Sequence, residues 1–250
     1  MKKTGTVIKS NGGSMMCCIR YRRYNDVDVY FPRYDYLAEH VSYGNFKSGN
    51  IKCPYERTVY NIGYLGNGPY KVSENGKVTK VYDTWKHMLY RCYDPKFQEK
   101  HTTYKKCTVC DEWHNFQNFA EWYENNYYEI EGQIMNLDKD ILIKKNNVYS
   151  PETCVFVPHD INSLFTKSDA TRGDLPVGVH YDKQNKKYSA QCNIMGLKKF
   201  IGRYNTLEEA FQAYKAFKEA HIKQVADKYI DLIPQELYNA MINYEVKNDD

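Results

Sequence analysis

The spacing of apolar residues changes twice along this chain, and that change restricts its fold more than any other feature. Near the N-terminus, short strand-like runs alternate with turns, and Asn11-Gly12 between two such runs is a β-hairpin signal. From residue 81 to about 125, apolar side chains recur at the spacing of amphipathic helices. From about residue 136 strand-like runs return. The sequence therefore predicts an α+β fold built from separate modules.

Four segments follow from these patterns. We expect a small β-rich module of unassigned role at 1–75, a central module at 80–166, a three-stranded sheet packed on a helix at 174–232, and a helical tail at 233–250. Between the first two, the glycine-rich residues 61–70 predict a loop or linker. They lack the strand and helix that flank a phosphate-binding glycine loop.

Two apolar stripes in the central module have helical spacing. We interpret their aromatic side chains as core and not as a platform for stacking nucleic-acid bases, because each stripe occupies one helical face. The residues are Val81, Trp85, Met88, Leu89 and Cys92 in the first stripe, and Trp113, Phe116, Phe119, Ala120 and Tyr123 in the second.

Composition indicates a folded chain. Hydrophobic residues make up 42% and there are 25 tyrosines, unlike a disordered sequence. No apolar run approaches the ~20 residues of a membrane span, and the N-terminus lacks the apolar region of a signal peptide. The eight cysteines are dispersed without an export signal, so we expect reduced thiols. These features predict a cytoplasmic protein with no membrane partner.

Positive charge is concentrated locally, although the net charge of +4 is modest. Residues 177–204 contain six Lys and Arg against the single Asp182, whereas 231–250 are acidic. A basic surface beside exposed aromatic residues suits a polyanion such as nucleic acid. A solvated charged face explains the same charges equally well.

The segment after residue 176 predicts three strands and then a helix that begins with a capping box, Thr206 and Glu209. Gly178-Val179, Lys187-Tyr188-x-Ala190, Ile201-Gly202-x-Tyr204 and Thr206-x-Glu208-Glu209-Ala210-x-x-Ala213-Tyr214 resemble the Apetala-type (ethylene-response-factor-like) DNA-binding domain over about 50 residues. The resemblance implies that the sheet lies in the major groove of double-stranded DNA.

Polar residues of the predicted sheet and its turns are the candidates for DNA contact. Gln191, Asn193 and Arg203 are candidates for base contacts, and the lysines for phosphate contacts. Plant members usually carry several arginines here, whereas this chain has mostly lysine, which lacks the bidentate fork that recognises guanine. The full set is His180, Lys183, Lys186, Lys187, Gln191, Asn193, Lys198, Lys199 and Arg203.

The stretch 136–162 predicts two strands, Asp138–Ile143 and Cys154–Val157, joined by the turn KKNN and followed by a helix from about Asp160. With the segments before it, this stretch resembles the ββα-metal core of phage HNH-type, homing-like endonucleases. Four motifs carry the resemblance: Trp85-x-x-Met88-x-x-Arg91-Cys92, Val109-Cys110-x-x-Trp113-x-x-Phe116, Leu137-Asp138-Lys139 and Tyr149-Ser150-Pro151-x-x-Cys154.

The resemblance implies hydrolysis of phosphodiester bonds with one Mg2+ (or Mn2+) and no small-molecule cofactor. Asp138 falls at the metal ligand of the first strand and Asn162 at the ligand of the helix, with Asn147 or Thr153 between them. Many HNH enzymes have a histidine base where this chain has Lys139. The candidate catalytic residues are therefore Asp138, Lys139, Asp140 on the same face of the strand, and His159, while His114 is another possible imidazole.

Two further alternatives stay open at this level. Cys92, Cys107, Cys110 and Cys154 could hold a structural zinc, although only Cys107-x-x-Cys110 has the usual pair spacing; otherwise they are small buried residues. The expected function is a DNA endonuclease that nicks or cuts double-stranded DNA. The alternative is a DNA-binding regulator or counter-defence protein with a degenerate HNH-like scaffold, which Lys139 favours. RNA binding gains little support, because no single-strand-binding module is evident.

Overall fold

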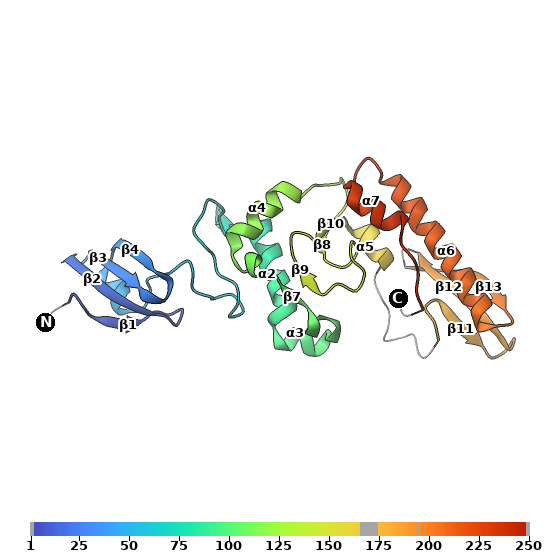
Figure 1. Ribbon diagram of the computed structural model, residues 1–250, viewed down its shortest axis with the longest axis horizontal. Coiled ribbons are helices and arrows are strands. Elements are labelled where there is room, and N and C mark those ends of the chain that lie inside the picture. The colour runs from blue at the N-terminus through green and yellow to red at the C-terminus, as the bar shows by residue number, and fades with distance from the viewer. Residues whose placement is uncertain (1–2, 166–174, 195, 249–250) are drawn as a thin grey trace. The chain divides into compact units, whose positions relative to one another are not determined.

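The computed structural model describes residues 3–165, 175–194 and 196–248, and its fold is α+β (Figure 1). The chain forms two compact units, Met1–Asn125 with Asn147–Pro151, and Asn126–Asn146 with Glu152–Asp250. The expected central module at 80–166 thus contributes to both units, because the chain leaves the second unit at residue 147 and returns to it at 152. In the described ranges, no helix has the length and apolar character to cross a membrane.

The first unit begins with an antiparallel sheet whose strand order is β1–β2–β3–β4. The hairpin predicted at Asn11-Gly12 is confirmed, since β1 pairs with β2 and Val7 lies opposite Cys17. One face of the sheet packs around fully buried Met16 and Phe31. The elements are β1 (Val7–Lys9), β2 (Met15–Arg23), β3 (Asp26–Phe31), η1 (Pro32–Tyr34), β4 (Tyr36–Val41) and α1 (Tyr43–Lys47).

Residues 61–70 form a loop that is fastened to the helices after it. The side chain of Gln117 donates to the carbonyl of Tyr70 at 3.0 Å and accepts from the N–H of Tyr70 at 3.0 Å. Gly63 lies against the ring of Trp85, which leaves no room for a side chain at this position. The segment is therefore an ordered loop packed on its own unit.

The helical part of the first unit confirms both predicted apolar stripes as core. Trp85 and Trp113 are fully buried, and the Trp85 indole donates to the Trp113 carbonyl at 2.7 Å. The elements are β5 (Ser73–Glu74), β6 (Lys77–Val78), α2 (Lys80–Tyr93), α3 (Pro95–Lys100), η2 (Thr102–Lys106), β7 (Thr108–Val109), η3 (Asp111–His114), α4 (Phe116–Asn126) and β9 (Val148–Tyr149), of which β7 and β9 pair in parallel.

The second unit contains a strand pair with a helix, a three-stranded sheet and two further helices (Figure 1). The predicted order of three strands and a helix is confirmed, and so is the capping box, in which Thr206 and Glu209 exchange hydrogen bonds. The elements are β8 (Met135–Asp138), β10 (Val155–Pro158), α5 (His159–Phe165), β11 (Val179–Asp182), β12 (Lys187–Ile194), β13 (Leu197–Tyr204), α6 (Leu207–Lys228) and α7 (Gln235–Ile242).

Helix α6 belongs to two hydrophobic cores of the second unit. Near its start, Phe211 and Tyr214 pack with buried residues of β11 and β12. Near its end, Ile222 and Ala226 are fully buried in a cluster that also contains β10, α5 and α7. One continuous helix therefore connects the three-stranded sheet with the strand pair that carries Asp138.

Candidate functional site

The strand pair and helix that contain the predicted metal ligands lie within the second unit. β8 and β10 are antiparallel, with Asp138 opposite Val155 and Met135 opposite Pro158. The apolar residues of β10 are buried, and α5 contacts both strands. The backbone N–H of His159 donates to the carbonyl of Ile134 at 2.9 Å, which fixes the start of α5 beside the start of β8.

Asp138 is the last residue of β8, which corrects the predicted strand Asp138–Ile143. Its Oδ1 accepts hydrogen bonds from the backbone N–H groups of Asp140 at 2.9 Å and Ile141 at 2.8 Å. An aspartate whose side chain accepts from the N–H groups two and three residues later turns the chain, so Asp140 does not share a strand face with Asp138. Burial, and then the nearby carboxylate of Asp140, raise the pKa of Asp138 to about 6.

Lys139, another predicted catalytic residue, follows Asp138, and its side chain is largely buried. The Nζ atom donates to Oδ2 of Asp140 at 3.1 Å. The carbonyl of Lys139 accepts from the side-chain amide of Asn146 at 2.7 Å, which closes the loop between them. Both the ammonium and the backbone carbonyl of Lys139 are thus held by residues of the same loop.

The two remaining residues of the predicted site lie on α5. Asn162 is half-buried, whereas His159 is exposed at the first position of the helix. His159 follows Pro158, which pairs with Met135, so it is level with the start of β8. Asp138 lies three residues farther along that strand, about 10 Å at the ordinary strand rise. This register places His159 away from Asp138.

His114, the other candidate imidazole, belongs to the first unit and is buried there. Its Nε2 lies 3.1 Å from the carbonyl of Val109, and burial lowers its pKa. Three of the four candidate zinc ligands, Cys92, Cys107 and Cys110, are in the same unit. The fourth, Cys154, is in the second unit, and zinc binding stays a prediction.

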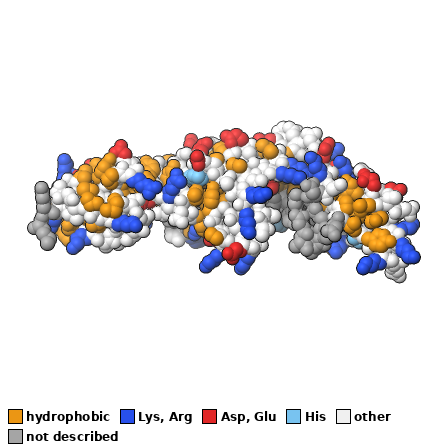
Figure 2. Space-filling model, turned by 60° about the horizontal axis from the view of Figure 1, so that its bottom comes forward, with side chains coloured by type: hydrophobic (Ala, Val, Ile, Leu, Met, Phe, Trp, Pro, Cys, Tyr) orange, Lys and Arg blue, Asp and Glu red, His pale blue; other side chains and the backbone are white. Residues whose placement is uncertain are grey.

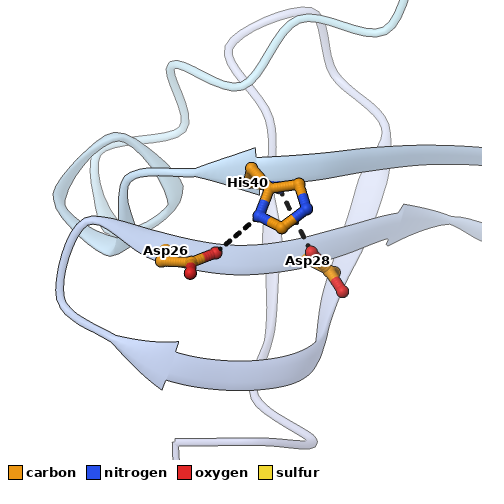
Figure 3. A group of neighbouring side chains, drawn as sticks. All are labelled: Asp26, Asp28 and His40. Carbon is orange, nitrogen blue, oxygen red and sulfur yellow. Dashed lines mark hydrogen bonds and ion pairs between the residues drawn. The ribbon is translucent and has the colours of Figure 1, made fainter.

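A different cluster, Asp26, Asp28 and His40 on the N-terminal sheet, brings three potential metal-ligand atoms close together (Figure 3). Arg22 already occupies both carboxylates, with contacts of 2.9 Å to Asp26 and 2.7 Å to Asp28. His40 Nδ1 lies 2.9 Å from Asp26. Arg22 lowers the pKa of buried Asp28 to about 2. The cluster is therefore a charge network that is neutralised by the protein's own cations.

The sheet β11–β12–β13 has one face covered by α6 and one face open to solvent. Val179, Ala190 and Cys192 are buried against Tyr214 of α6. Since successive strand residues point to opposite faces, the residues between them point outward. The predicted DNA-contact residues that share this outward face are His180, Lys187, Gln191, Asn193, Lys198 and Arg203.

Lys198 and Lys199 lie on opposite faces of the sheet. Lys198 lies opposite Asn193 on the outward face, whereas Lys199 lies opposite buried Cys192. Lys199 is exposed, but the register assigns it to the side covered by α6. The prediction that Lys198 and Lys199 share one DNA-contact face is therefore corrected, because adjacent residues of a strand point to opposite faces of the sheet.

Phe200 lies on the outward face opposite Gln191 and was missed in the sequence, although it follows the strand alternation. Its side chain is 50% exposed, and the guanidinium of Arg203 lies 5.3 Å from the centre of its ring. Arg203 also makes an ion pair with Asp182 at 3.0 Å. The outward face thus presents an exposed aromatic ring beside an arginine that is oriented by a carboxylate.

The turn between β11 and β12 carries the other two candidate lysines, Lys183 and Lys186, both exposed. Oδ1 of Asp182 accepts from the N–H groups of Gln184 and Asn185, and Lys186 has a left-handed φ of 52°. In the space-filling view, Lys and Arg side chains border hydrophobic ones over the part of the molecule that holds this sheet (Figure 2). The two lysines extend the basic surface beyond the strands.

Comparison with models of protein families, with curated proteins and with solved structures finds no match to this chain.

Proposed function

We propose that the protein is a DNA-binding, metal-dependent endonuclease of the HNH type that hydrolyses phosphodiester bonds of double-stranded DNA. One observation carries this proposal: an antiparallel strand pair leads directly into a short helix, with Asp138 ending the first strand and Asn162 within the helix. This is the order of elements that the HNH resemblance implies.

The outward face of β11–β13 supports the assignment of DNA as the substrate. Gln191 and Asn193 present amide groups that can pair with base edges in the major groove. Lys187 and Lys198 lie on the same face, and each lysine can neutralise a phosphate. A sheet of this kind binds through many phosphate contacts, with the amides adding sequence preference.

The residues around Asp138 fit a divalent cation. Its two backbone hydrogen bonds both end on Oδ1, so Oδ2 accepts neither of them. Burial, and then the neighbouring carboxylate of Asp140, raise the pKa of Asp138, and a bound cation would favour the charged form of that carboxyl. Asp138 and Asn162 would hold Mg2+, which would stabilise negative charge on the leaving 3'-oxygen.

The test compares the wild-type protein with Asp138→Asn on supercoiled plasmid, with Mg2+ or Mn2+ and with EDTA. The amide oxygen of asparagine can still accept both backbone hydrogen bonds, so this variant keeps the turn but loses the charge. We expect cleavage that requires the metal and falls at least a hundredfold in the variant, while a gel shift shows unchanged DNA binding. Equal cleavage by both proteins would overturn the proposal.

A second candidate is a DNA-binding protein whose HNH-like core has lost catalysis. The ion pair between Lys139 and Asp140 favours it, because it replaces a base with a bound ammonium. This candidate predicts no metal-dependent cleavage by the wild type, with salt-sensitive retention of the same DNA in a gel shift. Lys139→His restores an imidazole at that position, and a gain of cleavage in this variant would identify a lapsed nuclease centre.

A further inference from the structure

The segment after α7, residues 243–248, connects the two cores of the second unit. Tyr244 packs against both hydrophobic clusters, the one beneath the sheet and the one around α5 and α7. Val246 is buried beneath the sheet, and its N–H donates to Glu219 of α6 at 2.8 Å. The carbonyl of Asn248 accepts from the N–H of Val177, just before β11, at 3.2 Å. We call residues 243–248 the C-terminal strap.

The strap also holds the loop that follows Asp138. Nζ of Lys144 donates to the carbonyl of Glu245 at 2.7 Å and lies 4.5 Å from the centre of the Tyr244 ring. Ile141, whose N–H is bound by Asp138, is buried in the same cluster as α7. Both anchors of the loop, one apolar and one cationic, are thus within six residues of Asp138.

The contact between loop and strap is not closely packed along its whole length. A groove of about 290 Å³ lies between Ile141, Leu142 and Lys144 on one side and Ala240 and Tyr244 on the other. The bridge from Lys144 to Glu245 lies beside this groove, whereas Ile141 is buried in the cluster around α7. The bridge is therefore one of the contacts that join the loop to the strap.

We propose that Lys144 and Tyr244 are positioning residues for the site at Asp138: the strap holds residues 139–146 in the conformation in which their backbone N–H groups fix the Asp138 carboxylate. This inference rests on the proposed function. The contacts that carry it run from Asp138 through Ile141 and Lys144 to Tyr244. Because Oδ1 of Asp138 is bound by the loop's own N–H groups, a loop that moves away also releases the carboxylate.

The direct test is hydrogen–deuterium exchange of residues 139–146 in the full chain. Lys144→Met keeps most of the side-chain length but loses the ammonium, and Lys144→Arg retains a cation. We expect exchange to rise about tenfold in Lys144→Met, as expected for loss of one hydrogen bond to a charged group, and to stay near the wild-type rate in Lys144→Arg. Lys223→Met, an exposed lysine of α6, is the matched control and should change nothing in the loop.

Tyr244 gives an independent pair of variants. Tyr244→Phe keeps the ring that faces the ammonium and should retain loop protection, whereas Tyr244→Leu should lose it. Circular dichroism establishes that each variant is folded. Unchanged exchange in both Lys144→Met and Tyr244→Leu would overturn the inference.

A second readout separates this inference from the proposed function. If the wild type cleaves DNA, Lys144→Met should raise the Mg2+ concentration for half-maximal cleavage severalfold while leaving DNA affinity unchanged. A purely structural role would lower the amount of folded protein without changing that concentration. If the wild type does not cleave, the proposed function fails, and the exchange experiment still decides whether the strap holds the loop.

Discussion

At the scale of single residues, the raised pKa of Asp138 lowers the free energy of unfolding by an amount that can be measured. In the unfolded chain its carboxyl loses its proton near pH 3.8, whereas in the folded protein the pKa is about 6. Between these values the folded state keeps a proton that the unfolded state has lost, so stability falls as pH rises. Above pH 6 the whole penalty is present, up to about 3 kcal/mol.

Asp138→Asn should remove this penalty. We expect the variant to be more stable than the wild type at pH 8, by up to about 3 kcal/mol, and the difference to vanish near pH 4. Urea unfolding in EDTA at several pH values measures it. Asp231→Asn, which removes an exposed carboxylate in the same unit, is the control. A variant that is no more stable than the wild type at pH 8 would contradict the assigned pKa.

The sequence predicted Asp138 and Asn162 as metal ligands, which stays a prediction, and it did not predict the environment of Lys139. Motif spacing specifies which residue types occur, and it carries no information on which side chains become buried together. The burial of Lys139 and its contact with Asp140 depend on the turn that Asp138 caps. That turn is the feature that the strand prediction for 138–143 overlooked, because Asp is common both in turns and beside strand ends.

At the scale of elements, local sequence patterns were sufficient to predict a helix or a hairpin where a single apolar helix face or a single turn determines it. α2 begins at a threonine cap and buries its predicted stripe, and α6 begins at the predicted capping box. The parallel pairing of β7 with β9 joins short segments about 40 residues apart, which no local pattern specifies. The β5–β6 hairpin was missed although Asn75-Gly76, both with positive φ, is a strong hairpin signal.

The register of β12 and β13 gives a prediction for DNA binding. Lys198→Ala removes a charge from the outward face, whereas Lys199→Ala removes an equal charge from the side covered by α6. We expect Lys198→Ala to weaken binding severalfold and to reduce the slope of log K against log salt by about 1. Lys199→Ala should leave both quantities near wild type.

Fluorescence anisotropy with a labelled duplex, measured from about 50 to about 200 mM salt, gives both the DNA affinity and its salt dependence. The two variants have the same net charge and adjacent positions, so any difference between them reports the face and not the total charge. Equal losses in both would contradict binding through the outward face and would favour general attraction to a basic surface.

At the scale of the whole molecule, the hydrophobic cluster around Met16 and the one around Ile222 belong to different units. All three tryptophans, Trp85, Trp113 and Trp122, belong to the first unit. The core around α6 and α7 in the second unit contains tyrosines but no tryptophan among the residues described. Tryptophan fluorescence therefore follows the first unit, whereas far-UV circular dichroism follows both.

A core variant in each unit tests whether the units unfold separately. Ile222→Ala removes a fully buried side chain of the second unit and should destabilise it by about 2–5 kcal/mol. We expect one step of the circular dichroism melt to move to lower temperature while the fluorescence midpoint stays unchanged. Leu89→Ala, fully buried in the first unit, should shift the fluorescence midpoint. If both variants shift both signals together, the chain unfolds as one cooperative unit. In that case a loss of stability in one unit also lowers the temperature at which the other unit unfolds.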